Sequence, residues 1–144
     1  MIKIICIGSL KEKYLKEAIE DYLKRINKYH KIKIIELPDS NIDEEGDKII
    51  KHLDNKDYII AMDIDGIELS STELSQKIDK TFITNSSISF IIGGSNGIRQ
   101  DIKDKANYRL SFSKLTYPHG LFRLILLEQI YRSFKILNNE TYHK

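Results

Sequence analysis

Two kinds of apolar pattern alternate along this chain. Residues 1–7 and Ser87–Ile92 are short apolar runs rich in isoleucine, and such runs are typical of buried strands. Residues 11–29 instead carry apolar side chains at every third or fourth position, with Lys and Glu on the opposite face, which indicates an amphipathic helix. The full pattern predicts strands at 1–7, 31–37, 58–64, 87–92 and 107–111, and helices at 11–29, 47–53, 71–80, 101–105 and 118–137.

The order of these elements predicts the fold class. Strands and helices alternate, with no internal repeat and no linker, so we expect one α/β domain over residues 1–144. Its sheet should be largely parallel, with helices on both faces. Two local signals refine the boundaries. Asp65-Gly66 is a turn signal after the third strand, and Ser70 or Ser71 with Glu73 fits a capping box at the next helix.

The helix predicted at 118–137 is apolar almost all round its circumference. A helix that lies on one face of a sheet needs only a single apolar stripe. This helix is therefore either a central core helix or a helix whose second side packs against another subunit, with two-fold contact as the default. The sequence leaves both interpretations open.

Composition excludes several classes of protein. Apolar residues make up 41% and charged residues 31% of the 144 positions, and seven glycines and two prolines are too few for a collagen-like or low-complexity chain. Cys6 is the only cysteine, which excludes an internal disulfide and a cysteine-cluster zinc site. Its apolar surroundings predict burial. No apolar run suits a signal peptide or a membrane span, so we expect a soluble cytoplasmic protein.

The formal charge of +2 hides an uneven distribution of charged residues. Residues 1–35 hold nine Lys or Arg against four Asp or Glu, and residues 99–144 hold the same numbers. Residues 36–57 hold three against eight. Either the surface is a mixture of solvated faces, or the two basic ends converge on a polyanion.

Two loops at strand ends are candidates for ligand binding. The run GGSNG at 93–97 follows a predicted strand at its carboxyl end, where open α/β sheets bind ligands, although it fits neither the dinucleotide fingerprint nor the P-loop. Residues 111–120 also join a strand to a helix, and they offer hydroxyls, backbone amides and a cation. Each loop also has a purely structural interpretation, as a tight turn or a helix cap. Together they predict one pocket.

Other polar residues carry weaker signals. The four histidines show no metal-ligand spacing, so we expect no metal site, and His119 is the best placed of them because it lies beside the second loop. Asp63 and Asp65 form a D-x-D pair at a strand end. Such a pair can bind a metal or serve as an acid and a base, but no further acidic ligands cluster at suitable spacing, so we interpret it as solvated. The tail at 142–144 either frays or offers an aromatic ring, an imidazole and a cation to a nucleotide.

Several segments together resemble a known family. FIIGGSNG at 90–97, LSFSKLTYPH at 110–119 and YHK at 142–144 resemble the signatures of the bacterial 23S rRNA pseudouridine-N3 methyltransferase family (RlmH), of the SPOUT superfamily. GSLKEKY at 8–14 and LEQIYRSFKI at 127–136 are also similar to that family. The resemblance covers the whole chain. One departure is the acidic segment at 41–57, which is shorter than in many relatives and lies away from these motifs.

The resemblance implies a SPOUT-type trefoil knot near the C-terminus, a homodimer, and S-adenosylmethionine bound in the knot. It also implies methyl transfer to N3 of a pseudouridine in 23S rRNA, on the assembled ribosome. Carried over by motif, the implied cofactor contacts are Met62, Gly93, Phe112, Ser113, Lys114, Leu115, Thr116 and Tyr117.

N3 of pseudouridine carries an imide proton, so the reaction needs a proton acceptor and cations near the developing anion. We nominate His143 as the proton acceptor or substrate orienter, and Tyr142 as the group that stacks on the base or hydrogen-bonds to it. Arg123 and Lys144 would contact the anion or phosphates, and His119 is a reserve base. In a dimer, the tail of one subunit could lie over the cofactor of the other.

Two rival classes of function stay open. A non-enzymatic ribosome-binding factor with a SPOUT fold would bind ribosomes but not S-adenosylmethionine. A different α/β enzyme, such as a transferase that acts on a small molecule, would show no RNA-dependent activity. Binding of S-adenosylmethionine and loss of an rRNA methyl group in a strain that lacks the protein would separate all three.

Overall fold

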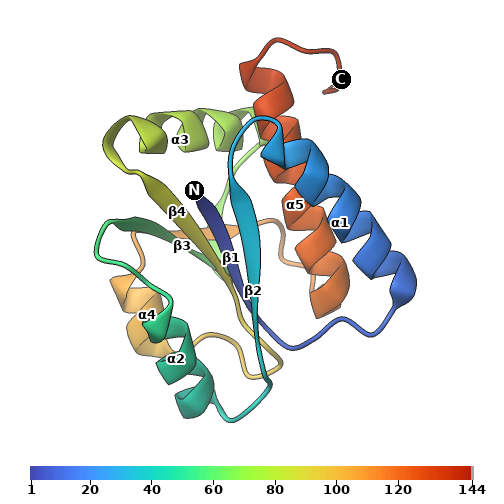
Figure 1. Cartoon of the computed structure of the whole chain (residues 1–144). Coiled ribbons are helices and arrows are strands. Elements are labelled where there is room, and N and C mark those ends of the chain that lie inside the picture. Colours follow the sequence, from blue (N-terminus) through green and yellow to red (C-terminus); the bar gives the residue numbers. More distant parts are fainter. Residues whose placement is uncertain (144) are drawn as a thin grey trace.

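The computed structural model describes residues 1–143 as five strands and five helices that alternate along the chain (Figure 1). The strands are β1 (Ile2–Ile7), β2 (Ile32–Leu37), β3 (Asp57–Glu68), β4 (Ser87–Ile92) and β5 (Tyr108–Ser111). The helices are α1 (Lys13–Asn27), α2 (Ile42–Lys51), α3 (Ser71–Thr84), α4 (Gln100–Lys105) and α5 (His119–Leu137).

All five strands are parallel and lie in the order β2-β1-β4-β3-β5, so their carboxyl ends share one edge of the sheet. Helices α1, α3 and α5 cover one face, and α2 and α4 cover the other (Figure 1). The predicted class, an α/β fold with a parallel sheet and helices on both faces, is confirmed. The trefoil knot stays a prediction.

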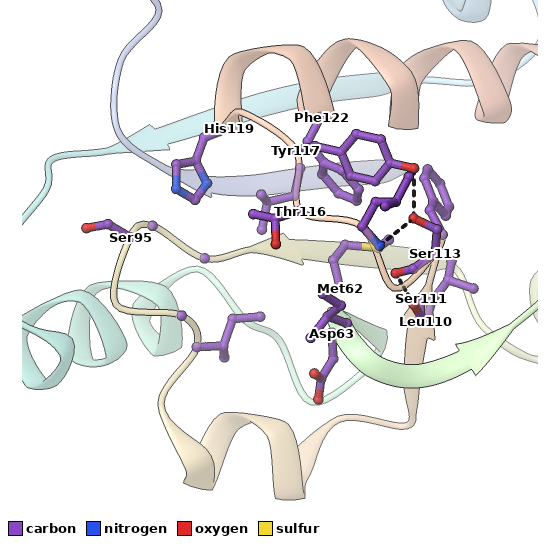
Figure 2. A pocket seen from close by; sticks show the side chains of 18 of the residues that line it. Met62, Asp63, Ser95, Leu110, Ser111, Ser113, Thr116, Tyr117, His119 and Phe122 are labelled. Carbon is purple, nitrogen blue, oxygen red and sulfur yellow. Dashed lines mark hydrogen bonds between the residues drawn. The ribbon is translucent and has the colours of Figure 1, made fainter.

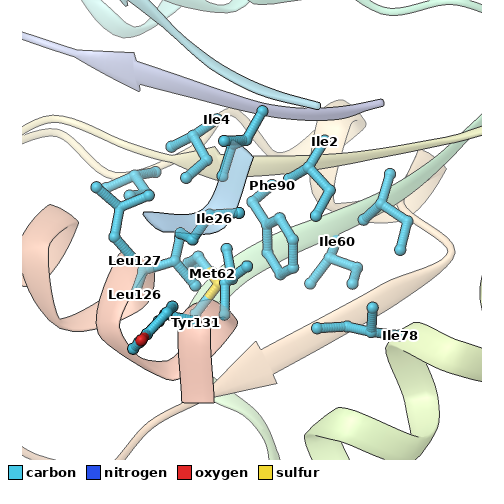
Figure 3. Packing of buried hydrophobic residues seen from close by; sticks show 14 of the residues in the cluster. Ile2, Ile4, Ile26, Ile60, Met62, Ile78, Phe90, Leu126, Leu127 and Tyr131 are labelled. Atoms are coloured by element: carbon cyan, nitrogen blue, oxygen red, sulfur yellow. The ribbon is translucent and has the colours of Figure 1, made fainter. Parts of the chain in front are cut away.

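Alternation along the strands divides the core between these two faces. In β1, Ile2 and Ile4 belong to the cluster under α1, α3 and α5, while Ile5 and Ile7 belong to the cluster under α2 and α4. In the larger cluster, Phe90 of β4 is fully buried among aliphatic side chains from the strands and helices (Figure 3). Parallel strands covered on both faces need apolar residues at nearly every position, which explains the isoleucine-rich runs.

Helix α5 is the central helix of its layer. It packs against both α1 and α3, with the Tyr22 and Tyr131 rings 5.8 Å apart on one side and a hydrogen bond from Ser71 Oγ to Gln129 Oε1 on the other. Burial of α5 against the sheet and two neighbouring helices accounts for most of its apolar circumference. Leu121, in its first turn, is 39% exposed.

Two predicted boundaries are wrong. Helix α2 begins at Ile42 rather than at 47, because the Asn41 side chain accepts a hydrogen bond from the Glu44 N–H and so caps the helix. The Asp65-Gly66 pair is not a turn that ends β3 but lies inside this strand, at an irregularity where the pairing with β5 shifts. The capping box at Ser70 and Glu73 is confirmed, although α3 extends to Thr84.

Candidate functional site at the carboxyl edge of the sheet

A cavity of about 430 Å³ lies at the carboxyl ends of β3, β4 and β5 (Figure 2). The loop after β4 forms one of its walls, and the loop between β5 and α5 forms another. Both loops that the sequence singled out therefore meet at one pocket. Seven of the eight implied cofactor contacts line it: Met62, Gly93, Phe112, Ser113, Leu115, Thr116 and Tyr117.

The glycine loop turns tightly at the cavity wall. The Gly97 N–H donates to the Gly94 carbonyl oxygen at 3.0 Å and closes the turn. A Cβ on Gly93 would lie 2.7 Å from the backbone carbonyl of Gly97, so no larger residue fits there without a shift of the backbone. The glycine run thus presents main chain, rather than side chains, to whatever occupies the cavity.

The loop from β5 to α5 is held in shape by its own hydroxyl groups. Ser113 Oγ lies 2.9 Å from the Tyr117 hydroxyl and accepts a hydrogen bond from the Leu115 N–H at 3.0 Å (Figure 2). The Phe122 ring lies 5.3 Å from Phe112 and 5.5 Å from Tyr117, between ring centroids. The result is a rigid loop with an aromatic side, which suits a flat heterocycle.

Three further side chains lie at or next to this cavity. His119, the first residue of α5, lies on its wall. Lys114 lines a separate shallow hollow outside the loop, next to Asp65. Asp63 lines the cavity and is 9% exposed, so the interpretation of Asp63 as a solvated strand-end residue is wrong. Alternation along β3 places Asp63 on the same face as the buried Ala61, under α4, and this signal could have predicted its burial.

The C-terminal tail lies far from this cavity within one chain. The Tyr142 ring packs 5.0 Å from Tyr131, and His143 Nδ1 lies 3.1 Å from Arg132 Nη1. The Tyr142 hydroxyl also donates to Glu128 Oε2 at 3.4 Å. These contacts lie at residues 128–132 of α5, whereas His119 is at its start, a separation of about 14–20 Å along the helix axis. Burial, followed by hydrogen bonding to Tyr22, raises the pKa of Tyr142 to about 12, so its hydroxyl is protonated at neutral pH. Lys144 lies outside the described residues.

Arg123 lies on another side of α5 and does not line the cavity. Its side chain is 3% exposed; Nη1 pairs with Glu36 Oε2 at 2.5 Å, and Nη2 donates to the Gly8 carbonyl oxygen at 3.3 Å. The Nε atom is buried without a partner within residues 1–143. In the single chain, Arg123 therefore ties α5 to the ends of β1 and β2.

Comparison with known proteins agrees with this architecture. The model of a family described as "Predicted SPOUT methyltransferase" matches residues 1–143. The Ribosomal RNA large subunit methyltransferase H of Clostridium botulinum (strain 657 / Type Ba4) is 48% identical, and the alignment covers 99% of each chain. The protein of the same name from Caldicellulosiruptor saccharolyticus is 44% identical over the full length of both. This chain belongs to the RlmH family of SPOUT methyltransferases.

A solved structure shows the same fold at low sequence identity. A probable methylase family protein from Haemophilus influenzae Rd KW20 superimposes with a TM-score of 0.58 at 11% identity. The match covers 99% of this chain and 70% of that one. At this identity the likeness supports the fold alone.

Membership of the RlmH family calls for a methyl donor, and the cavity residues fit one that contains a nucleoside. The cavity is lined by the loop with aromatic side chains and by the main chain at Gly93, where no Cβ fits. Two charged side chains, Asp63 and Lys103, lie at one side of it. Residues 1–143 contain no cluster of three or more metal-ligating side chains. No helix in the same stretch is both long and apolar enough to cross a membrane.

The two basic ends of this RlmH-family chain do lie side by side, in α1 and α5 (Figure 1). Their cations are partly neutralised, because Arg25 pairs with Asp21, Arg132 with Glu128 and Lys135 with Glu140. Two exposed lysines on α1, Lys16 and Lys24, form no ion pair with another described residue. The cationic face is therefore more modest than the count of basic residues suggests.

Proposed function

We propose that this protein transfers the methyl group of S-adenosylmethionine to N3 of a pseudouridine in 23S rRNA of the assembled ribosome, in the cytoplasm. The observation that carries the proposal is the cavity at the carboxyl edge, where the motifs shared with the RlmH family form a single nucleoside-sized pocket. The names of the curated relatives support a large-subunit rRNA as the substrate.

In this proposal the donor supplies a methyl group on a sulfonium, and the protein supplies position and electrostatics. A protein base would accept the N3 proton as N3 takes up the methyl group, and the donor would leave as a neutral thioether. His143 is our candidate proton acceptor or orienting group. Tyr142, protonated at neutral pH, is a hydrogen-bond donor that also has a ring to stack on the base.

We further propose that the active site is shared between two subunits of a homodimer. Within one chain His143 contacts Arg132, about 20 Å along α5 from His119 on the cavity wall, so in this arrangement a base on the tail does not reach a donor in the same chain's cavity. A two-fold dimer with antiparallel α5 helices would bring each tail to the partner's cavity. The exposed Leu121 beside the cavity and Leu115 on its rim are apolar surface available to such a partner.

A protein of 144 residues has little surface with which to read a long RNA sequence. A folded ribosomal site, recognised through its shape and its phosphates, fits this limit. The unpaired lysines of α1 suit phosphate contact, and the modest cationic face favours one defined site over general RNA binding.

Calorimetry with S-adenosylmethionine tests the donor site, and mass spectrometry of 23S rRNA from a strain that lacks the protein tests the product. We expect donor binding and the loss of one methylated pseudouridine, restored when the purified protein acts on ribosomes from that strain. Ribosome binding without donor binding would instead establish a non-enzymatic factor. Methylation of free 23S rRNA at the same rate as ribosomes would refute the assembled-ribosome substrate.

Mixed dimers test the shared site. Thr116 is exposed on the cavity wall, so Thr116→Trp should block the cavity without disturbing the core. Neither this variant nor a chain that lacks residues 142–144 should be active alone. After random exchange, a mixture should recover about a quarter of wild-type activity, because half of the dimers then hold one complete site. A mixture without activity, despite demonstrated exchange, would contradict the shared site.

A further inference from the structure

Strand β3 brings one acidic side chain to the cavity immediately before an irregularity. Asp63 follows Ala61 by two residues, so alternation along the strand places it on the face covered by α4. Both Met62 and Ile67 pair with Leu110 of β5, so the four residues from Asp63 to Gly66 bulge out of the ladder. The bulge is tight, because a Cβ on Gly66 would lie 2.7 Å from the Arg109 backbone. Bulges of this kind re-aim side chains and are common beside active sites.

The bulge separates the two acidic residues of the D-x-D pair. Asp63 turns inward, with 6% of its side chain exposed, and lies on the side of the cavity opposite Tyr117 and His119 (Figure 2). Asp65 stays exposed, and its N–H donates to Asp63 Oδ1 at 3.1 Å. The main chain of the bulge therefore fixes one carboxylate oxygen and leaves the other, Oδ2, facing Lys103.

Lys103 of α4 brings a positive charge to the same part of the cavity. Its Nζ lies 3.6 Å from Asp63 Oδ2, which is close enough for attraction but too long for a hydrogen bond. Within residues 1–143, neither this Nζ nor this Oδ2 forms a hydrogen bond. The Asp63 side chain is 6% exposed and that of Lys103 25%, and no hydrogen bond joins their charged groups, so the buried carboxylate is poorly compensated for the water it has lost. Both groups retain hydrogen-bonding capacity directed at the cavity.

These charges match one part of the proposed methyl donor. The amino-acid end of S-adenosylmethionine carries an ammonium and a carboxylate on the same carbon, whereas its adenine and ribose are uncharged. Besides Asp63, Lys103 and the imidazole of His119, the cavity is lined by apolar side chains, hydroxyls and main chain. A carboxylate and an ammonium 3.6 Å apart complement such a zwitterion.

We propose that Asp63 and Lys103 bind the amino-acid end of the methyl donor, Asp63 through its ammonium and Lys103 through its carboxylate. This inference rests on the proposed function, since it presupposes that the donor occupies this cavity. The aromatic and glycine loops then hold the nucleoside, and the bulge of β3 holds the charged end.

Calorimetry without RNA separates the two ends of the donor. Asp63→Asn should weaken S-adenosylhomocysteine about ten- to a hundred-fold, as expected for a lost hydrogen bond between charged groups. It should change the Kd of 5′-methylthioadenosine, which keeps the nucleoside but lacks the amino acid, by less than about three-fold. Asparagine retains the Oδ1 acceptor for the Asp65 N–H, so the bulge should persist. Asp65→Asn, on the exposed side of the same bulge, is the matched control.

A second comparison, between S-adenosylmethionine and its decarboxylated form, tests the proposed contact of Lys103 with the donor's carboxylate. Lys103→Met should weaken S-adenosylmethionine about ten-fold or more, and should leave binding of the decarboxylated donor nearly unchanged. Lys105→Met, on the exposed part of the same helix, is the control.

The possible outcomes are distinct. If wild-type protein binds none of these ligands, the proposed donor site fails. If wild type binds them, but Asp63→Asn lowers the affinity for S-adenosylhomocysteine and for 5′-methylthioadenosine equally, Asp63 contacts the nucleoside and our assignment is overturned. Unchanged binding of all ligands by a folded Asp63→Asn or Lys103→Met variant, with a wild-type thermal transition, would also overturn it.

Discussion

Strand β3 carries a buried aspartate at each end of its buried part, and the two differ in how they are satisfied. Asp57, at the amino edge of the sheet, accepts hydrogen bonds on Oδ2 from Lys3 Nζ at 2.6 Å, Ser89 Oγ at 3.0 Å and the Asp54 N–H at 3.0 Å. Asp63, at the carboxyl edge, accepts one from the Asp65 N–H and faces Lys103 across 3.6 Å. The Asp57 carboxylate has its hydrogen-bond partners within the protein, whereas the Asp63 carboxylate can still accept hydrogen bonds from a ligand.

The contrast extends to the two edges of the sheet. At the amino edge, polar groups link β1, β3 and β4 to one another and serve stability. At the carboxyl edge, glycines, short hydroxyl residues and a bulged strand line a cavity. We therefore expect substitutions at the amino edge to affect unfolding, and those at the carboxyl edge to affect ligands and turnover.

Removal of the tail should have the largest effect on turnover. Deletion of residues 142–144 should reduce methylation by about a thousand-fold or more, the order expected when a proton acceptor and a base-stacking group are lost together. The Kd of S-adenosylmethionine should stay within about two-fold of wild type, because residues 142 and 143 contact α5 at positions 128–132 and do not line their own chain's cavity. Single-turnover methylation assays and calorimetry measure the two quantities. Full turnover by the shortened chain would remove the tail from the mechanism.

At the amino edge, Asp57→Asn should reduce the free energy of unfolding by about 3 kcal/mol, because it leaves the Lys3 ammonium without its carboxylate. Urea denaturation at pH 7 measures this loss. Affinity for S-adenosylmethionine should not change. Asp63→Asn should show the reverse behaviour, with weakened donor binding and a stability change within about 1 kcal/mol. A large loss of stability in both variants would abolish the contrast between the two aspartates.

The hydrogen bonds of Asp57 also predict how the stability of the protein depends on pH. Burial acts to raise the pKa of Asp57, but hydrogen bonds from Lys3, the Asp54 N–H and Ser89 outweigh it and hold this pKa below its usual value. The stabilisation is therefore present above the unfolded-state pKa of about 4, and is lost as the pH falls through the folded-state pKa. Asp57→Asn should have a flatter stability profile than wild type below about pH 4. Parallel profiles for the two proteins would contradict the assignment.

These residues also illustrate what the sequence could predict. Periodicity identified every strand and helix, with boundaries that differ by up to five residues, because the core covers each element and local pattern and burial agree. The two loops were recognisable because strand ends in an open α/β sheet share one edge. Asp63 was misjudged because a D-x-D sequence at a strand end is equally compatible with a solvated turn, although alternation places Asp63 on the α4 face with Ala61. The exposure of Asp65 depends on the bulge, and so on how β3 pairs with β5, which no local pattern shows.

A substitution at Gly66 should disrupt the bulge of β3. Gly66→Ala places a Cβ 2.7 Å from the Arg109 backbone, so the strands must separate locally, at a cost of about 1–3 kcal/mol. Because the bulge supplies the Asp65 N–H that holds Asp63 Oδ1, donor affinity should fall together with stability. Amide exchange should rise around residues 63–68 and in β5, and stay as in wild type in β1 and β2. An unchanged Kd would show that Asp63 reaches the cavity without the bulge.

The smallest effect should come from His119, although it lies on the wall of its own cavity. If the proton acceptor arrives on the partner's tail, His119→Ala removes a neighbouring group and should lower the rate by less than about ten-fold. The pH dependence of single-turnover methylation should keep its wild-type midpoint in this variant and change in His143→Ala, which separates a neighbouring imidazole from the reacting one. If His119→Ala instead abolishes turnover while donor binding persists, the base comes from the cavity's own chain and the tail serves only to hold the nucleotide.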